Sequence, residues 1–210
     1  MISFSGYRWQ WHHSPFKKKA PGPNYWHKNA LWVDEKGYLH LKIVRDPKTK
    51  HWYCAALQSI DKMGLGRYEF ELERLPPMDK NVVFGLFSYS GIDFFDEVDI
   101  EFSQWGKAGT PNLHYTVYPA ENSSAQILQD SLHFLSSEKP VIFSIIREKD
   151  RIIFEQKTTE ETIDRRIFRS DAFSQKSMPV FINLWLFQHQ APSDGQAVEM
   201  VIRKFQFSPL

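Results

Sequence analysis

The most informative segment of the chain is FFDEVDIEFSQWG, residues 94–106. Within it, three acidic residues alternate with three large apolar residues, which is the period of two expected of a β-strand. The alternating positions are Glu97, Val98, Asp99, Ile100, Glu101 and Phe102. One face of the predicted strand therefore carries three carboxylates, and the other face is suited to packing into a core.

The acidic face is unusual for a structural strand. Like charges at this spacing repel one another, and buried carboxylates contribute nothing to a core. An exposed edge strand with protective charges is an alternative, but such edges usually mix signs and favour Lys. Here all three charges have one sign, and aromatic residues such as Phe95 and Trp105 flank them. The pattern favours a functional site over a solvated edge.

Glycoside hydrolysis is the chemistry that fits three clustered carboxylates. Retaining glycosidases hold two carboxyl groups about 5–5.5 Å apart, whereas inverting enzymes hold them about 6.5–9.5 Å apart. Residues four apart on a strand have Cα atoms about 13 Å apart. Two Glu side chains leaning together on a concave sheet can close most of that gap. Crowding also separates carboxyl pKa values, so that one group can remain an acid while another is ionised.

The segment Glu97-Val98-Asp99-Ile100-Glu101 resembles the Glu-x-Asp-x-Glu signature of glycoside hydrolase family 16, which includes laminarinases, lichenases and xyloglucan-modifying enzymes. The resemblance implies that Glu97 is the nucleophile, that Asp99 assists it and that Glu101 is the acid/base. It further implies a retaining endo-β-glycosidase that hydrolyses a β-glucan-type polysaccharide through a covalent glycosyl-enzyme intermediate.

Two other segments resemble substrate-contacting regions of this family. In GPNYW, Asn24 and Trp26 are candidates for substrate contacts, with simple loop packing as the alternative. In PVFINLWLFQ, which resembles a Met-Asn-Leu-Trp strand facing the cleft, Asn183 and Trp185 share one face. Trp185 is therefore expected to stack on a sugar.

Three more residues complete the expected substrate-binding set. Phe87, in NVVFGLFSYS, stands where the family has Trp, which keeps a stacking surface but loses the indole donor. His114, in PNLHYTVYPA, is expected beside the acids, where it contacts the acid/base or a sugar hydroxyl, or is simply a satisfied surface histidine. Trp105 follows the acids directly and is expected in the cleft.

Periodicity predicts an all-β fold. Roughly a dozen strands occur at the 8–12-residue spacing of a sandwich, and no segment shows clean helical periodicity. Pro and Gly mark residues 12–30 as a loop. The charged residues 148–151, Glu-Lys-Asp-Arg, are expected to be the turn of a hairpin. We expect one domain over residues 1–210, a concanavalin-like antiparallel β-jelly-roll sandwich with the acids in a concave substrate cleft.

Composition limits the partners. A net charge of +1 favours neither nucleic acid nor an anionic membrane, and no apolar run reaches the 18 residues of a membrane span. The first residues, MISFSGYRWQW, lack the pattern of a signal peptide, although members of the resembled family are often secreted, so localisation stays open. The single cysteine, Cys54, is expected to be a small buried hydrophobe. We expect a monomer that binds a polysaccharide or oligosaccharide and needs no cofactor.

Other functions are compatible with the same residues. A catalytically silent glucan-binding lectin could use the same jelly roll, and a transglycosylase could use the same acids. A calcium site with Asp93 or Asp96 joining the three acids is a further alternative, although acids along one strand spread too widely to surround an ion alone. The pair His12–His13 lacks a spaced partner and is not expected to bind metal.

Overall fold

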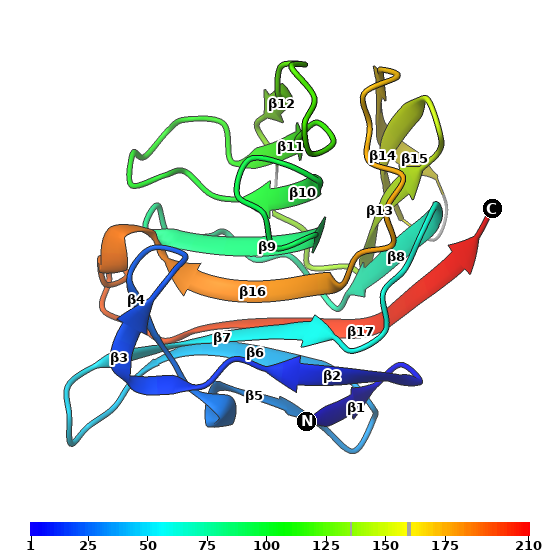
Figure 1. Ribbon diagram of the computed structural model, residues 1–210. Helices are drawn as coiled ribbons and strands as arrows, with labels where there is room; N and C mark the ends of the chain where they lie inside the picture. Colours follow the sequence, from blue (N-terminus) through cyan, green and yellow to red (C-terminus); the bar gives the residue numbers. More distant parts are fainter. Residues whose placement is uncertain (135, 159–160) are drawn as a thin grey trace.

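Two antiparallel β-sheets pack face to face in a computed structural model that describes residues 1–134, 136–158 and 161–210 (Figure 1). The first sheet contains the acidic segment and has the strand order β12 (Leu128–Leu132), β11 (Leu113–Val117), β10 (Glu97–Phe102), β9 (Val82–Tyr89), β16 (Val180–Leu186), β7 (Trp52–Ser59), β2 (Tyr7–Trp11) and β1 (Ile2–Phe4). This arrangement is the predicted β-jelly-roll sandwich.

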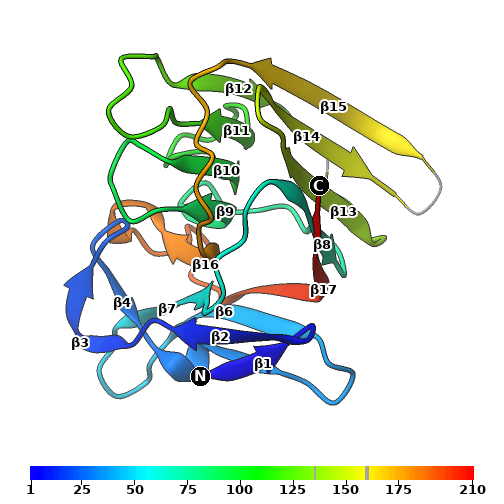
Figure 2. The same cartoon turned by 45° about the vertical axis from the view of Figure 1, so that its right-hand side comes forward.

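The second sheet lies behind the first and is easier to follow in the turned view (Figure 2). Its strand order is β15 (Thr162–Arg169), β14 (Arg151–Lys157), β13 (Val141–Arg147), β8 (Gly66–Leu72), β17 (Val198–Pro209), β6 (Leu39–Arg45) and β5 (Leu31–Val33). In the described residues the only helices are two short 3-10 turns, η1 (Lys28–Ala30) and η2 (Phe187–His189). None of these helices is long and apolar enough to cross a membrane.

The core lies between the sheets, because alternate side chains of each strand point inward. The apolar positions of β10, Val98, Ile100 and Phe102, are all buried, which confirms the predicted alternation. The ring of Phe102 packs edge to face on Phe143 of β13 at a centroid distance of 4.9 Å. Such contacts anchor the acidic strand to the opposite sheet, and each buried aromatic ring contributes about 1.5–3 kcal/mol.

Residues 12–30 are more ordered than the predicted loop. They form a small hairpin of β3 (Ser14–Lys19) and β4 (Asn24–Trp26), and β4 runs parallel to the start of β7. The indole of Trp26 donates a hydrogen bond to the Lys19 carbonyl and so ties the two strands together. The Pro and Gly residues mark the tip of the hairpin, and the prediction of a loop over the whole segment was wrong.

Cys54 is buried in β7, as predicted, and its thiol donates to the side-chain oxygen of Asn24 at 3.5 Å. Burial raises the pKa of the Cys54 thiol, which keeps it protonated. The predicted turn at residues 148–151 is also present, with β13 and β14 joined by a hydrogen bond from the Glu148 amide to the Arg151 carbonyl.

Candidate active site

Strand β10 presents its three acids on the face of the first sheet that points away from the core. Because Val98, Ile100 and Phe102 point inward, Glu97, Asp99 and Glu101 must point to the opposite side. β10 is not an edge strand: it pairs with β9 on one side and β11 on the other. The acids therefore lie within a sheet face, which excludes the reading of protective charges on an exposed edge.

The pKa values of all three carboxyls are raised. Burial is the largest cause for each, and it raises the pKa of Glu97 to about 8 and that of Glu101 to about 7. Repulsion between the acids adds to the effect at Glu97 and Asp99. A hydrogen bond between these two carboxyls lowers the pKa of Glu97 and raises that of Asp99, as expected when Asp99 keeps the proton and donates it.

Crowding was expected to separate the carboxyl pKa values, so that one group stays an acid while another is ionised. Instead the pKa values of both Glu97 and Glu101 are raised, and for Glu101 the cause is burial. In the described part of the chain, no cation lies within 4.0 Å of any of the three acids to oppose these shifts.

A cavity of about 380 Å³ opens beside Glu97. Aromatic rings form much of its wall, and the hairpin of β3 and β4 closes one side through Ala20 and Pro21. Its other lining residues are His12, Ala56, Phe87, Tyr89, Asp93, Phe94, Tyr118, Phe181 and Asn183. Pockets that are mostly apolar, with a few polar groups that converge, are typical small-molecule and sugar sites.

The row of the sheet that contains Glu101 includes a glycine. The partner of Glu101 across β9 is Gly85, and the partner of Gly85 across β16 is Asn183. A Cβ atom at position 85 would lie 2.5 Å from the Asn183 Oδ1 atom, so only glycine leaves this side chain in place. The same Oδ1 atom is buried and has no hydrogen-bond partner among the described residues, and Asn183 lines the cavity, which makes it a candidate acceptor for a ligand hydroxyl.

Phe87 lies on the cavity wall, as the sequence predicted, and has an unpredicted companion. Its ring stacks on Phe181 with a centroid distance of 5.1 Å and an interplanar angle of 13°. Phe181 alternates with Asn183 and Trp185 on β16, so the same period of two could have identified it. Tyr89 alternates with Phe87 on β9 in the same way and was also missed.

Trp185 is more buried than expected for a residue that stacks on a sugar. Only 6% of it is exposed, and a Cβ atom on Gly22 of the hairpin would lie 2.4 Å from its ring. The hairpin tip therefore covers the indole face, and within the described part of the chain the indole Nε1 has no hydrogen-bond partner. Trp105 lies next to it, with ring centroids 6.3 Å apart. The predicted open stacking surface at Trp185 is not present in this conformation.

Asn24 and Trp26 lie on β4 of the hairpin and do not line the cavity. Trp26 is 1% exposed and belongs to the hydrophobic core. Asn24 is fully buried, and its amide donates to the carbonyls of Pro21 and Leu186, at 3.0 and 2.9 Å. Of the two readings of this segment, packing describes the structure: Asn24 ties the hairpin to the end of β16, and Trp26 ties its two strands together.

His114 stands directly opposite Glu101 in the pairing of β10 and β11, but its ring nitrogens are engaged elsewhere. Nε2 donates to the Ser103 carbonyl at 2.9 Å, which leaves Nδ1 to accept from the Ser131 hydroxyl at 2.8 Å. Of the two readings given from the sequence, the satisfied histidine describes this geometry. The hydrogen-bond partners of His114 come from other segments and could not be predicted from the segment that contains His114.

The proposed extra calcium ligands have other partners. Asp93 accepts a hydrogen bond from the Tyr89 hydroxyl at 2.7 Å, and buried Asp96 pairs with the Lys176 ammonium at 2.6 Å. Among the described residues, no group of three or more His, Cys, Asp or Glu side chains has the geometry of a metal site. His13 lies beside His27, with ring centroids 5.0 Å apart, while His12 lines the cavity.

Comparison with known proteins gives matches at the level of structure. No family model matches the chain, and no curated protein sequence matches it. A prokaryotic β-1,3-1,4-glucanase (lichenase) from a mouse hindgut metagenome is similar, with a TM-score of 0.68 and 20% identity over 96% of this chain and 93% of that one.

Two further structures are similar over nearly their whole length. A glycoside hydrolase family 16 endo-glucanase from Bacteroides ovatus, in complex with G4G3G-2F-DNP, has a TM-score of 0.71 and 15% identity over 95% of this chain and 94% of that one. A Mycobacterium tuberculosis antigen described as a pseudo β-1,3-glucanase has a TM-score of 0.69 and 14% identity over 95% and 91%. The chain thus has the jelly-roll fold of the family 16 glucanases.

Proposed function

We propose that the protein is a retaining endo-β-glycosidase that hydrolyses a β-glucan-type polysaccharide. The observation that carries the proposal is the set of Glu97, Asp99 and Glu101 on one face of β10, beside an aromatic-lined cavity. Two of the similar structures are described as glucanases, which supports β-glucan as the substrate class. Fold alone does not decide activity, because another is described as a pseudo-glucanase.

In the first step, a Glu97 carboxylate oxygen attacks the anomeric carbon while Glu101 donates its proton to the glycosidic oxygen. The bond from the anomeric carbon to the leaving sugar breaks, and an ester bond to Glu97 forms. The attack requires the ionised form of Glu97, and the hydrogen bond from Asp99 favours that form against the burial and repulsion that raise the pKa of Glu97 to about 8. Burial raises the pKa of Glu101 to about 7, so that a large fraction of this group is protonated near neutral pH and can act as the general acid.

In the second step, Glu101 takes a proton from water, whose oxygen attacks the anomeric carbon. The ester bond breaks, and Glu97 returns as a carboxylate. Each step inverts the anomeric carbon, so the product retains the configuration of the substrate. Asn183 is proposed to bind a sugar hydroxyl through its unpartnered Oδ1, and the stacked rings of Phe87 and Phe181 to form an apolar wall for the sugar.

The proposal is tested by incubating the protein with β-1,3-, mixed β-1,3/1,4- and β-1,4-glucans and with galactans, with products followed by mass. Release of oligosaccharides by the wild type but not by Glu97→Gln supports hydrolysis at this site. Binding without release would identify a lectin, and products longer than the substrate would identify a transglycosylase. Release that a chelator abolishes would contradict a mechanism carried by the carboxylates alone.

A further inference from the structure

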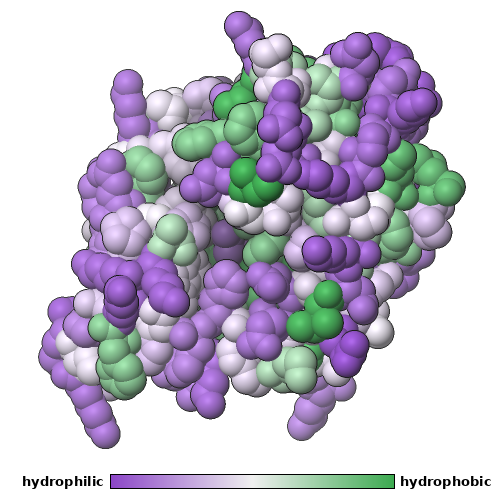
Figure 3. Space-filling model, viewed as in Figure 1, coloured by the Kyte–Doolittle hydropathy of each residue, from purple (hydrophilic) through white to green (hydrophobic). Residues whose placement is uncertain are grey.

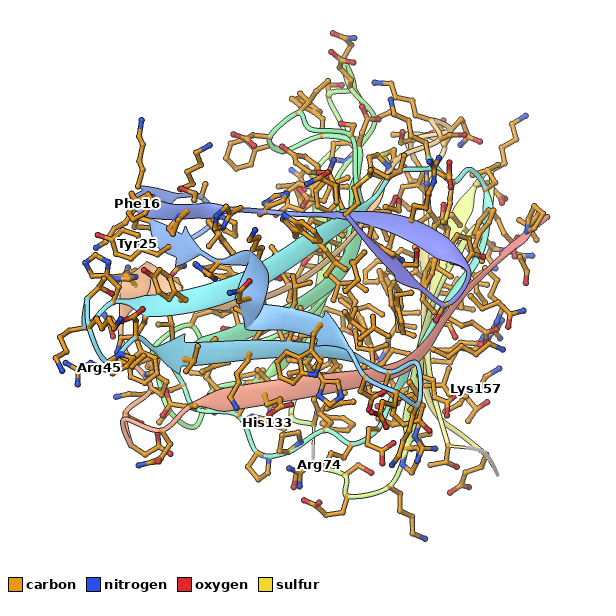
Figure 4. All side chains as sticks on the ribbon, turned by 90° about the horizontal axis from the view of Figure 1, so that it is seen from below. Phe16, Tyr25, Arg45, Arg74, His133 and Lys157 are labelled. Atoms are coloured by element: carbon orange, nitrogen blue, oxygen red, sulfur yellow. The ribbon has the colours of Figure 1, made fainter. Side chains whose placement is uncertain are left out.

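One edge of the molecule carries a cluster of cations from two segments far apart in sequence. The hairpin of β3 and β4 supplies three of them, and the turn between β6 and β7 supplies the others. We call this cluster the basic edge, and it consists of Lys17, Lys18, Lys19, Arg45, Lys48 and Lys50. Seen from below, Phe16, Tyr25 and Arg45 lie along this edge, on the side opposite Lys157 (Figure 4).

Aromatic contacts hold the two segments together. The ring of Tyr25, on β4, stacks on His51 at the end of the turn with a centroid distance of 4.2 Å and an interplanar angle of 6°. The Lys18 ammonium lies 5.5 Å from the centroid of the same Tyr25 ring. The Arg45 guanidinium donates to the Lys50 carbonyl at 3.3 Å. The six cations are therefore one continuous surface.

This surface has little negative charge to balance it. Residues 14–26 and 45–51 contain six of the 26 Lys and Arg residues of the chain but one of its 25 Asp and Glu residues, so the remainder is net negative. That one acid, Asp46, accepts hydrogen bonds from the backbone amides of Lys48 and Thr49 in its own turn. Across the described parts of the chain, none of the six cations forms an ion pair, and all six side chains are exposed.

The basic edge is continuous with the cleft. The hairpin that carries the three lysines also supplies Ala20 and Pro21 to the cavity wall and Gly22 to the face of Trp185. The ring of His189, just beyond the end of β16, lies 5.4 Å from the Tyr25 ring, centroid to centroid. In the space-filling view, hydrophilic side chains predominate along the left edge, where the hairpin and the turn lie (Figure 3). A polymer that leaves the cleft over the hairpin passes directly onto the cations.

We propose that the basic edge binds acidic groups, carboxylate or sulfate, on the polysaccharide that occupies the cleft. This inference rests on the proposed function and narrows its substrate to an anionic glycan. Unpaired cations attract such groups, and Phe16, which is 91% exposed among them, offers a ring face to a sugar. Continuity with the carboxylate cleft favours a glycan over a nucleic acid or an anionic membrane, neither of which would use the cavity.

The test compares a neutral β-glucan that the protein hydrolyses with carboxymethylated and sulfated forms of the same polymer. The measured quantity is KM on each polymer, for the wild type and for Lys17→Gln/Lys18→Gln/Lys19→Gln. A second variant, Arg45→Gln/Lys48→Gln/Lys50→Gln, tests the other segment. The control, Lys139→Gln/Lys149→Gln/Lys204→Gln, removes the same charge from exposed lysines that also lack ion pairs within the described residues.

We expect the KM on the neutral polymer, divided by the KM on the anionic polymer, to fall about tenfold in both basic-edge variants. In the control variant this ratio should stay at the wild-type value. Because the edge is exposed, raising the salt concentration should weaken the wild-type preference. The carboxymethylated and sulfated arms show which anionic group is bound. An equal fall in the control, or equal KM values for neutral and anionic polymers in the wild type, would overturn the proposal.

Failure of the proposed hydrolase function can be distinguished from failure of the basic edge to bind acidic groups. If the wild type hydrolyses none of the polymers, migration through gels that contain each polymer still measures binding. Retardation of the wild type by the anionic polymer, lost in the basic-edge variants, would support the basic edge without catalysis. Retardation by RNA or capture by anionic vesicles, with no retardation by the anionic glycans, would overturn it in favour of another partner.

Discussion

Glu155 on β14 and the three acids on β10 have opposite surroundings. On β14, Glu155 accepts ion pairs from Arg67 at 2.8 Å, Lys157 at 3.0 Å and Arg165 at 3.1 Å. Burial alone would raise its pKa, but the hydrogen bonds from Lys157 and Arg67 outweigh burial and lower it. On β10, three carboxylates lie close together with no cation within 4.0 Å in the described structure, and their pKa values are raised.

The difference separates a structural acid from acids kept for chemistry. Glu155 and its three cations satisfy one another, and that group needs no ligand. The β10 acids destabilise the native state by their burial and repulsion, which is typical of sites arranged for function. The same chain thus places three cations around Glu155 and, among the described residues, none within 4.0 Å of the β10 acids.

The largest expected effect is on the rate of Glu97→Gln. The amide keeps the shape of the side chain but cannot form the glycosyl ester, so hydrolysis should fall at least about 100-fold, or about 3 kcal/mol in transition-state stabilisation. Glu155→Gln is the matched control and should keep the wild-type rate. Initial rates on the preferred glucan decide the matter, and a Glu97→Gln rate above about a hundredth of wild type would remove Glu97 from the role of nucleophile.

Glu101→Ala tests which of the two glutamates is the nucleophile and which is the acid/base. An activated aryl glycoside needs no proton to depart, so the glycosyl ester should form and accumulate. Azide needs no general base, and it should restore turnover and yield the β-glycosyl azide, the retained product. Product configuration is read by NMR. The α-azide would show that the nucleophile had been lost and that Glu97 and Glu101 must exchange roles.

Replacing an acid by its amide should change the free energy of unfolding in opposite directions at Glu155 and on β10. Glu155→Gln removes an acid from three cations, two of them less than a third exposed, and should lower the free energy of unfolding by roughly 1–2 kcal/mol. Asp99→Asn removes a repelling carboxyl and should leave the free energy unchanged or raise it. Urea unfolding measures both. If Asp99→Asn lowered the free energy of unfolding as much as Glu155→Gln, the β10 acids would not be destabilising in the native state, and the contrast with Glu155 would be wrong.

The last prediction concerns the pH dependence of stability. Glu97 and Glu101 have folded pKa values of about 8 and about 7, above the unfolded value of 4.5, so the native state binds more protons between pH 4.5 and 8. The free energy of unfolding should therefore fall as pH rises through this window, with a slope of about 1.4 kcal/mol per pH unit for each carboxyl that is protonated only in the native state. Glu101→Gln should flatten the slope there.

Glu155 gives the opposite dependence and serves as the control. Its pKa is lowered, so its contribution is present above the unfolded value of 4.5 and is lost as the pH falls below it. Glu155→Gln should leave the slope between pH 4.5 and 8 unchanged. A wild-type stability that rises from pH 5 to pH 8 would contradict the raised pKa values on β10.

The sequence predicted what local alternation determines. The inward positions of β10 are buried as expected, because strand periodicity and hydrophobicity specify the same face. The jelly roll followed from the spacing of the strands and from the family resemblance. The expectation of one domain over residues 1–210, and the roles of the site residues, stay predictions.

Contacts between distant segments could not be predicted. Gly22 covers Trp185 although 163 positions separate them, and the partners of His114 come from a turn and a neighbouring strand. The raised pKa of Glu97 depends on how deeply the strand is buried, which alternation does not report. The basic edge could not be recognised from its lysine run alone, because Arg45, the first cation of its second segment, is 26 residues beyond Lys19.

Gly85 has a consequence for how this protein can change over generations. Any side chain at this position would press on the Asn183 side chain, next to the position that pairs with Glu101. A single base change in its codon would therefore disturb the wall of the cavity while leaving the three acids, and the packed core behind them, unchanged. Ligand preference can thus change over generations while the acidic signature in the sequence stays unaltered.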